Sequence, residues 1–131
     1  MQSSESLMSY QSVCLVAVCG AAGCVARLLV SIAARHWLGE PYPAATCIVN
    51  LLGCTLFGLC WGLHNGTWSK AAEMAVFVGF FGGFTTFSSF AFESFELLQA
   101  GRWWGACFLV LSQNLLGIGG LALGMKLGRS L

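Results

Sequence analysis

Charge is scarce in this sequence: only 8% of its 131 residues are Asp, Glu, Lys or Arg, and the net charge is +1. A soluble domain of this length needs far more charged surface to stay in water. Six basic residues against five acidic ones also give no basic excess, so we expect no nucleic-acid partner. Because no soluble catalytic domain fits, we predict that the protein is not an enzyme.

A CxxC pair is also missing, although the chain contains seven cysteines. All seven stand inside apolar stretches, where a thiol behaves as a small apolar group. We therefore predict free thiols rather than disulfides or a cysteine metal site. The N-terminal segment lacks the basic stretch of a signal peptide, so we expect the first apolar stretch to be retained as a membrane span.

Hydrophobic residues are abundant, at 57% of the chain, and the mean hydropathy is +0.79. A bilayer core about 30 Å thick is crossed by roughly 20 apolar residues of helix. Short polar connections divide the whole chain, 1–131, into one transmembrane domain with four such lengths, at about 12–34, 43–63, 72–99 and 103–125. The helices are apolar all round, which disfavours a soluble four-helix bundle. The sequence therefore predicts an all-α, multi-pass membrane protein.

The basic residues do not favour one orientation in the membrane. Counting by the predicted topology puts three on each side: Lys70, Lys126 and Arg129 on one, and Arg27, Arg35 and Arg102 on the other. Without a bias, a chain can insert either way up, and two opposite copies can form an antiparallel dimer. Six charges are also few enough for the balance to be chance, so the count leaves dual topology open.

Glycine is frequent, with 17 residues, and most of these lie inside the spans, where small residues let helices approach closely. The third span differs, because Gly82 and Gly83 are followed by Thr85 and Thr86. Two glycines and two β-branched residues weaken a helix locally. We expect a break near residues 80–86, at about mid-membrane. Broken helices at that depth supply ion sites from freed carbonyls and helix N-termini.

Most polar side chains in the spans are hydrogen-bond donors, whereas Glu93 falls toward the end of its span. A proton-coupled exporter would need a carboxylate near the middle of the membrane. Neutral donors with one cation at the mouth suit an anion instead, and the candidates are Asn50, Ser88, Ser89, Ser112 and Arg27. Each hydroxyl can equally bond its own helix, and Asn50 can serve helix packing alone.

Three segments resemble the Fluc or CrcB family of fluoride channels. These are GAAGCVAR (20–27), PAATCIVNLLGCTLFG (43–58), in which Asn50 falls on the pore asparagine of the family, and GFFGGFTTFSSFAFE (79–93). The last of these is the most specific, because a GG, TTFS and F series is hard to obtain by chance inside an apolar span. The fourth span is similar only through Ser112 and its glycines. Phe108 stands where the family often has a tyrosine.

The resemblance implies a fluoride-selective channel that lets fluoride leave the cell passively and so protects it from fluoride toxicity. It implies a dual-topology antiparallel homodimer in the cell (inner) membrane, with two pores and one structural Na+ at the centre. Backbone carbonyls of Gly82 and Thr85 would hold that ion. The pore would be lined by the residues that match the family's motif, Asn50, Phe87, Ser88, Ser89, Phe90 and Ser112, with Arg27 in the vestibule.

The positive edge of an aromatic ring attracts an anion, which gives Phe87 and Phe90 a physical reason to line such a pore. Packing against lipid or core is the alternative for both rings. For the whole chain, the alternatives are an exporter of the small multidrug-resistance type and a non-conducting helical assembly protein. The exporter would need a glutamate in the first span, which the sequence does not contain.

Overall fold

The computed structural model describes residues 10–38, 43–64 and 66–131, and every structural statement below concerns these ranges. They form helices α1 (Tyr10–Leu38), α2 (Ala44–His64), α3 (Lys70–Glu73), η2 (Met74–Phe80), α4 (Phe81–Phe84), α5 (Phe87–Gln99) and α6 (Trp103–Ser130). Four lengths are long and apolar enough to cross a membrane: α1, α2, the composite span Lys70–Gln99 and α6. The predicted all-α membrane fold with a broken third helix is therefore confirmed.

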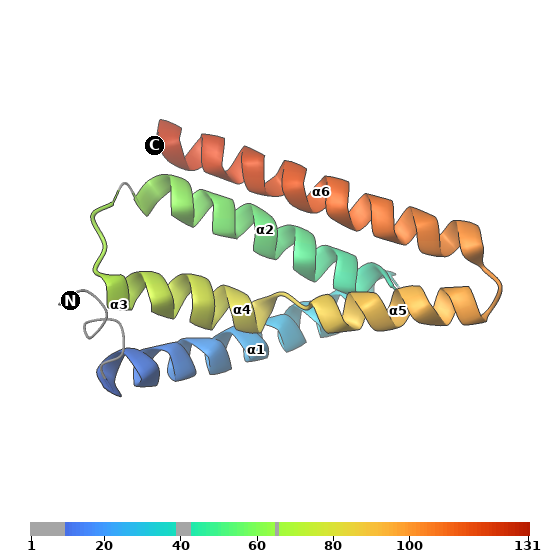
Figure 1. Ribbon diagram of the computed structural model, residues 1–131, viewed down its shortest axis with the longest axis horizontal. Helices are drawn as coiled ribbons and strands as arrows, with labels where there is room; N and C mark the ends of the chain where they lie inside the picture. The colour runs from blue at the N-terminus through green and yellow to red at the C-terminus, as the bar shows by residue number, and fades with distance from the viewer. Residues whose placement is uncertain (1–9, 39–42, 65) are drawn as a thin grey trace, which may run out of the picture.

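The four spans pack as two closely associated pairs (Figure 1). Helix α6 lies along α2, and α1 lies along the first half of the third span. Glycines permit the close α2–α6 approach: a Cβ added at Gly62 would come within 2.9 Å of Gly128 Cα. Helix α1 begins and α6 ends at the same end of the bundle, as an even number of spans requires.

Helices α1 and α6 extend beyond their expected ends at about residues 34 and 125, to Leu38 and Ser130. Arg35, which we expected in the first connection, lies in the last turn of α1 together with His36. Positive side chains at a helix C-terminus interact favourably with its dipole, so the helix can continue through the polar boundary of the membrane. The expected connecting residues 39–42 lie outside the described residues.

The third span is irregular before its break as well as at it. Met74–Phe80 forms a π-helix, a wider form that sequence patterns do not reveal. The break itself is limited to Thr85 and Thr86, whereas Gly82 and Gly83 remain helical in α4. Gly83 has a packing role, since a Cβ there would lie 3.2 Å from the backbone nitrogen of Cys24 on α1. Glycine therefore brings two helices together here and does not itself open the helix.

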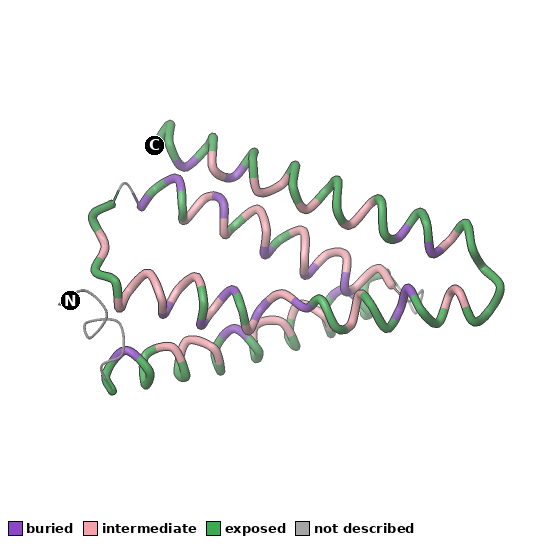
Figure 2. Tube along the Cα trace, in the orientation of Figure 1, coloured by how far each residue is buried: buried purple, intermediate pink, exposed green. Residues whose placement is uncertain are grey.

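Exposed residues lie along the outside of the bundle (Figure 2), and many of them have large apolar side chains. Leu29, Leu115 and Ile118 are more than half exposed, whereas the small core contains Val49, Phe81 and Leu109. Such a surface is costly in water and favourable in lipid or against another apolar surface. The fold therefore agrees with the multi-pass membrane location.

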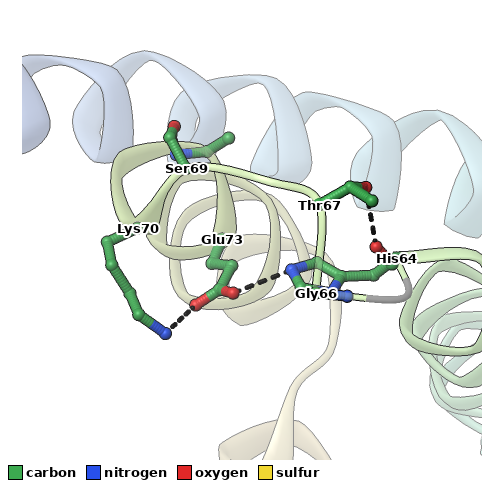
Figure 3. A network of polar contacts seen from close by, with 7 residues as sticks. His64, Gly66, Thr67, Ser69, Lys70 and Glu73 are labelled. Carbon is green, nitrogen blue, oxygen red and sulfur yellow. Dashed lines mark hydrogen bonds and ion pairs between the residues drawn. The ribbon is translucent and has the colours of Figure 1, made fainter.

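A polar network closes the connection between α2 and α3 (Figure 3). The Nδ1 atom of His64 accepts the backbone N–H of Gly66 at 2.8 Å, and Nε2 contacts the Glu73 carboxylate at 2.8 Å. Lys70 Nζ lies 2.9 Å from the other oxygen of Glu73. Gly66 has a φ of 71°, which glycine adopts without strain. This network secures one end of the bundle, away from the break.

Candidate ion pathway

Thr85 and Thr86 form an extended step between α4 and α5. Thr85 has a ψ of 158°, and Thr86 has φ −145° and ψ 111°. The side chain of Thr86 then caps α5, because its Oγ1 accepts the backbone N–H of Ser89 at 3.2 Å. Threonine suits this position since β-branched residues favour extended backbone and its hydroxyl can cap a helix.

Asn50 on α2 holds the break by pairing with both backbone groups of Thr86. Its Oδ1 accepts the Thr86 N–H at 2.9 Å, and its Nδ2 donates to the Thr86 carbonyl at 3.1 Å. Unpaired peptide groups inside a membrane cost several kcal/mol, so a side-chain amide that satisfies both makes the break tolerable. Asn50 thus replaces the hydrogen bonds that a continuous helix would have made.

The same bonds leave two carbonyls without their usual helical donors. In an unbroken helix, the amides of Thr86 and Ser89 would bond the carbonyls of Gly82 and Thr85. Here they bond Asn50 Oδ1 and Thr86 Oγ1 instead. Gly82 is exposed on the protomer, and a Cβ added to it would meet no atom within 4 Å. Free carbonyl oxygens on an open face are suited to a hard cation such as Na+.

A pocket of about 240 Å³ lies beside the break and is here called the phenylalanine pocket. It is lined by Asn50, Cys54, Thr85, Thr86, Phe87, Phe90, Gln113 and Asn114. The rings of Phe87 and Phe90 are 5.5 Å apart between centroids, at an interplanar angle of 60°. Three predicted pore residues, Asn50, Phe87 and Phe90, thus come together in one place.

A larger cavity of about 590 Å³, here called the arginine cavity, lies on the other side of Thr86. Its polar lining consists of Arg27, Ser31, Arg35, Thr46, Thr86, Ser88, Ser89 and Glu93. The predicted vestibule residue and two predicted pore serines therefore border this cavity rather than the pocket. Thr86 borders both, and its hydroxyl lies 3.3 Å from that of Ser88 and 3.1 Å from that of Ser89.

Glu93 takes a place that sequence reasoning did not give it. Its side chain is buried, its Oε1 accepts a hydrogen bond from Thr46, and its Oε2 is buried without a hydrogen-bond partner among the described residues. In the sequence, Glu93 was placed only toward the end of its span, and Thr46 was not among the candidate site residues. Their pairing joins α2 to α5 across 47 positions, which no local pattern reveals.

The fourth span contributes a different side chain from the predicted one. The Ser112 hydroxyl donates to the Leu109 carbonyl of its own helix at 3.2 Å, and Ser112 is not among the residues that line either space. Its neighbour Gln113 borders the phenylalanine pocket, and its Oε1 accepts from Asn50 Nδ2 at 2.9 Å. The neighbouring positions differ by about 100° around the helix, so only one of them can face Asn50 directly.

Comparison with known families matches residues 14–125 to the CrcB-like protein, Camphor Resistance (CrcB) family. The match spans all four helices, including the break. The chain belongs to the CrcB family. It is 42% identical over 117 residues to the fluoride-specific ion channel FluC of Rhodospirillum centenum, covering 88% of this chain and 93% of that protein.

Two further relatives carry the same name. The protein of Nitrobacter winogradskyi is 36% identical over 124 residues, which cover 93% of this chain and 98% of the relative. The protein of Solidesulfovibrio magneticus is 40% identical over 116 residues, with 87% and 93% covered. The sequence-based assignment to the CrcB family is therefore confirmed.

Proposed function

We propose that this protein is a fluoride-selective channel that allows passive fluoride efflux and so protects the cell. The single observation that carries the proposal is its similarity, over most of its length, to proteins named fluoride-specific ion channels. The site supports it, because the helix break, the amide of Asn50 and two phenylalanine rings lie together at the phenylalanine pocket.

The two spaces offer fluoride different chemistry. Fluoride is small and strongly hydrated, so a pore must replace its water with donors without binding it too tightly to leave. The arginine cavity is wide enough for a hydrated ion and has Arg27 on its wall. In the phenylalanine pocket, water would give way to amide donors and to the positive ring edges of Phe87 and Phe90. Ser88 and Ser89 border the arginine cavity next to Thr86, which borders both spaces, whereas the pore role of Ser112 stays a prediction.

Fluoride efflux from liposomes tests this proposal. Purified protein should release fluoride much faster than empty liposomes do, while chloride release stays near that background. An absence of fluoride flux would overturn the proposal. Flux that requires an imposed proton gradient would instead favour the exporter reading, which membership of the CrcB family disfavours.

We also propose an antiparallel homodimer with two pores. The even distribution of basic residues and the exposed apolar surface of the protomer support a second copy inserted the opposite way. A protease-cleavable tag on the C-terminus should be cut in about half of the molecules in sealed, oriented vesicles. Cleavage of all or none of the tags would show a single orientation and exclude this arrangement.

A structural Na+ at the dimer centre is the remaining part of the proposal. The residues fit the ion, since the amides that would bond the Gly82 and Thr85 carbonyls are bonded elsewhere. When bound, Na+ would offset the partial negative charge of these carbonyl oxygens. Native mass spectrometry of dimer purified in sodium should show one Na+ per dimer. A dimer with no bound Na+ under those conditions would contradict this part.

A further inference from the structure

The amide of Asn50 has no hydrogen left for an ion. A carboxamide has two N–H hydrogens, and the structure gives Asn50 Nδ2 two acceptors, the carbonyl of Thr86 at 3.1 Å and Oε1 of Gln113 at 2.9 Å. The orientation of Asn50 is fixed, because its Oδ1 accepts the Thr86 N–H. Turning this amide toward an ion would expose two peptide groups inside the membrane.

Gln113 is in the opposite situation. Its Oε1 is held by Asn50, which fixes which end of the amide is the donor, and its Nε2 is buried without a hydrogen-bond partner among the described residues. The neighbouring thiol of Cys47 is a weak acceptor. An unsatisfied buried donor is unfavourable, and an anion in the adjoining pocket would satisfy it.

The position of Gln113 supports a role in the pathway rather than in packing alone. It borders the phenylalanine pocket together with Phe87 and Phe90. Asn114 borders the same pocket, but it is exposed, and one of its two Nδ2 hydrogens already donates to the Val110 carbonyl of its own helix at 2.7 Å. Ser112 likewise bonds its own helix. Of these three consecutive polar side chains on α6, only Gln113 has a buried donor with no acceptor among the described residues other than the weak Cys47 thiol.

We propose that Gln113 supplies the amide donor that contacts the anion in the phenylalanine pocket, and that Asn50 is a positioning residue that holds both Thr86 and Gln113. This inference rests on the proposed channel function. It assigns the specificity of the pocket to a residue pair from α2 and α6, in which Asn50 orients and Gln113 donates.

The first test compares Gln113→Met with Gln99→Met. Methionine keeps the length of the glutamine side chain but has no N–H donor. Gln99 is exposed at the end of α5 and borders neither space, so it is a matched control for the same chemical change. We expect Gln113→Met to lower fluoride efflux at least about tenfold with the dimer intact by gel filtration, and Gln99→Met to change it less than about twofold.

If the wild-type protein releases fluoride and Gln113→Met releases it equally fast, the inference is wrong but the channel function stands. An inactive wild type would instead overturn the function itself. The two failures are therefore distinguishable.

A second measurement does not depend on the folding of a variant. The chain has four glutamines, at positions 2, 11, 99 and 113, so selective ¹⁵N labelling gives four side-chain amide pairs. In the wild-type channel, fluoride but not chloride should shift one pair. That pair is assigned to Gln113 because it remains in the spectra of the Gln2→Met, Gln11→Met and Gln99→Met variants. If none of the four pairs responds to fluoride, Gln113 is not the donor.

Discussion

The arginine cavity and the phenylalanine pocket meet at Thr86 but differ in size and chemistry. The cavity is more than twice as large, at about 590 Å³ against about 240 Å³, and contains guanidinium, hydroxyl and carboxyl groups. The pocket presents two phenylalanine rings and three amides, of which Asn50 has both hydrogens bonded and Asn114 has one. A wide space with a cationic side chain can raise the local concentration of hydrated anions. A narrow space with few free donors admits only an ion whose lost water those donors can replace.

This difference predicts that the phenylalanine pocket, rather than the arginine cavity, selects fluoride over other anions. Changes in the phenylalanine pocket should affect the fluoride rate at any salt concentration, because they act on a dehydrated ion. Changes in the arginine cavity should act through the local concentration of anions, which salt screens. Four substitutions test this division, in order of decreasing effect on flux.

Phe90→Ile should have the largest effect. Isoleucine keeps enough apolar volume to pack but has no ring edge, so a dehydrated anion would meet plain hydrocarbon. We expect fluoride efflux to fall about a hundredfold, which corresponds to about 2.7 kcal/mol in the barrier, with a folded dimer on gel filtration. Phe95→Ile is the control, because Phe95 is on the same helix, is 56% exposed and borders neither space. Normal flux through Phe90→Ile would make Phe90 a packing residue.

Asn50→Ala should rank second. The substitution removes the three hydrogen bonds that hold the break and Gln113, and leaves both backbone groups of Thr86 unpaired. We expect about a tenfold loss of flux together with lower thermal stability, because two peptide groups lose their partners. Thr55→Ala on the same helix is the control, since its hydroxyl bonds its own helix at Leu51. A stable dimer with normal flux would show that the break does not need Asn50.

Arg27→Gln should have a smaller effect that depends on salt. Arg27 is half-buried on the wall of the arginine cavity, and glutamine removes its charge while keeping a polar side chain. We expect about a threefold lower fluoride flux at low ionic strength, and little difference at about 1 M salt, where the Debye length is about 3 Å. Arg102→Gln, at the exposed start of α6, serves as the control. An equal loss at high and low salt would mean that Arg27 contacts the ion directly.

Glu73→Gln should have the smallest effect on flux. Glu73 pairs with His64 and Lys70 at the α2–α3 connection and borders neither space. We expect fluoride efflux to stay within about twofold of wild type, because the charge lies outside the pathway, and the melting temperature to fall slightly as the loop loses its ion pairs. A large loss of flux with an intact dimer would place this network in the transport mechanism.

The class of the protein, the number of spans and the family could be predicted from the amino-acid sequence alone. Length, hydropathy and scarce charge are properties of composition, and a bilayer of fixed thickness converts them directly into four helices. The glycine and threonine series also predicted the break, because local backbone preference is a local property. Asn50 was a candidate because it is an amide donor within a span, and Phe87 and Phe90 were found through the resemblance to a family. The structure places all three around one pocket.

Which backbone and side-chain groups are hydrogen-bonded, and which have no partner, could be read only from the fold. Asn50 and Gln113 are 63 positions apart, and Thr46 and Glu93 are 47 apart, so no local pattern pairs them. The π-helical stretch before the break packs against α1, and Gly82 and Gly83 lie in helix α4, which packs against α1 and α2. A sequence shows which side chains can donate a hydrogen bond. Whether a donor has a partner depends on acceptors that only the folded chain brings within about 3 Å. For that reason the sequence predicted Ser112 as the polar residue of the fourth span in the pathway, whereas the fold favours Gln113.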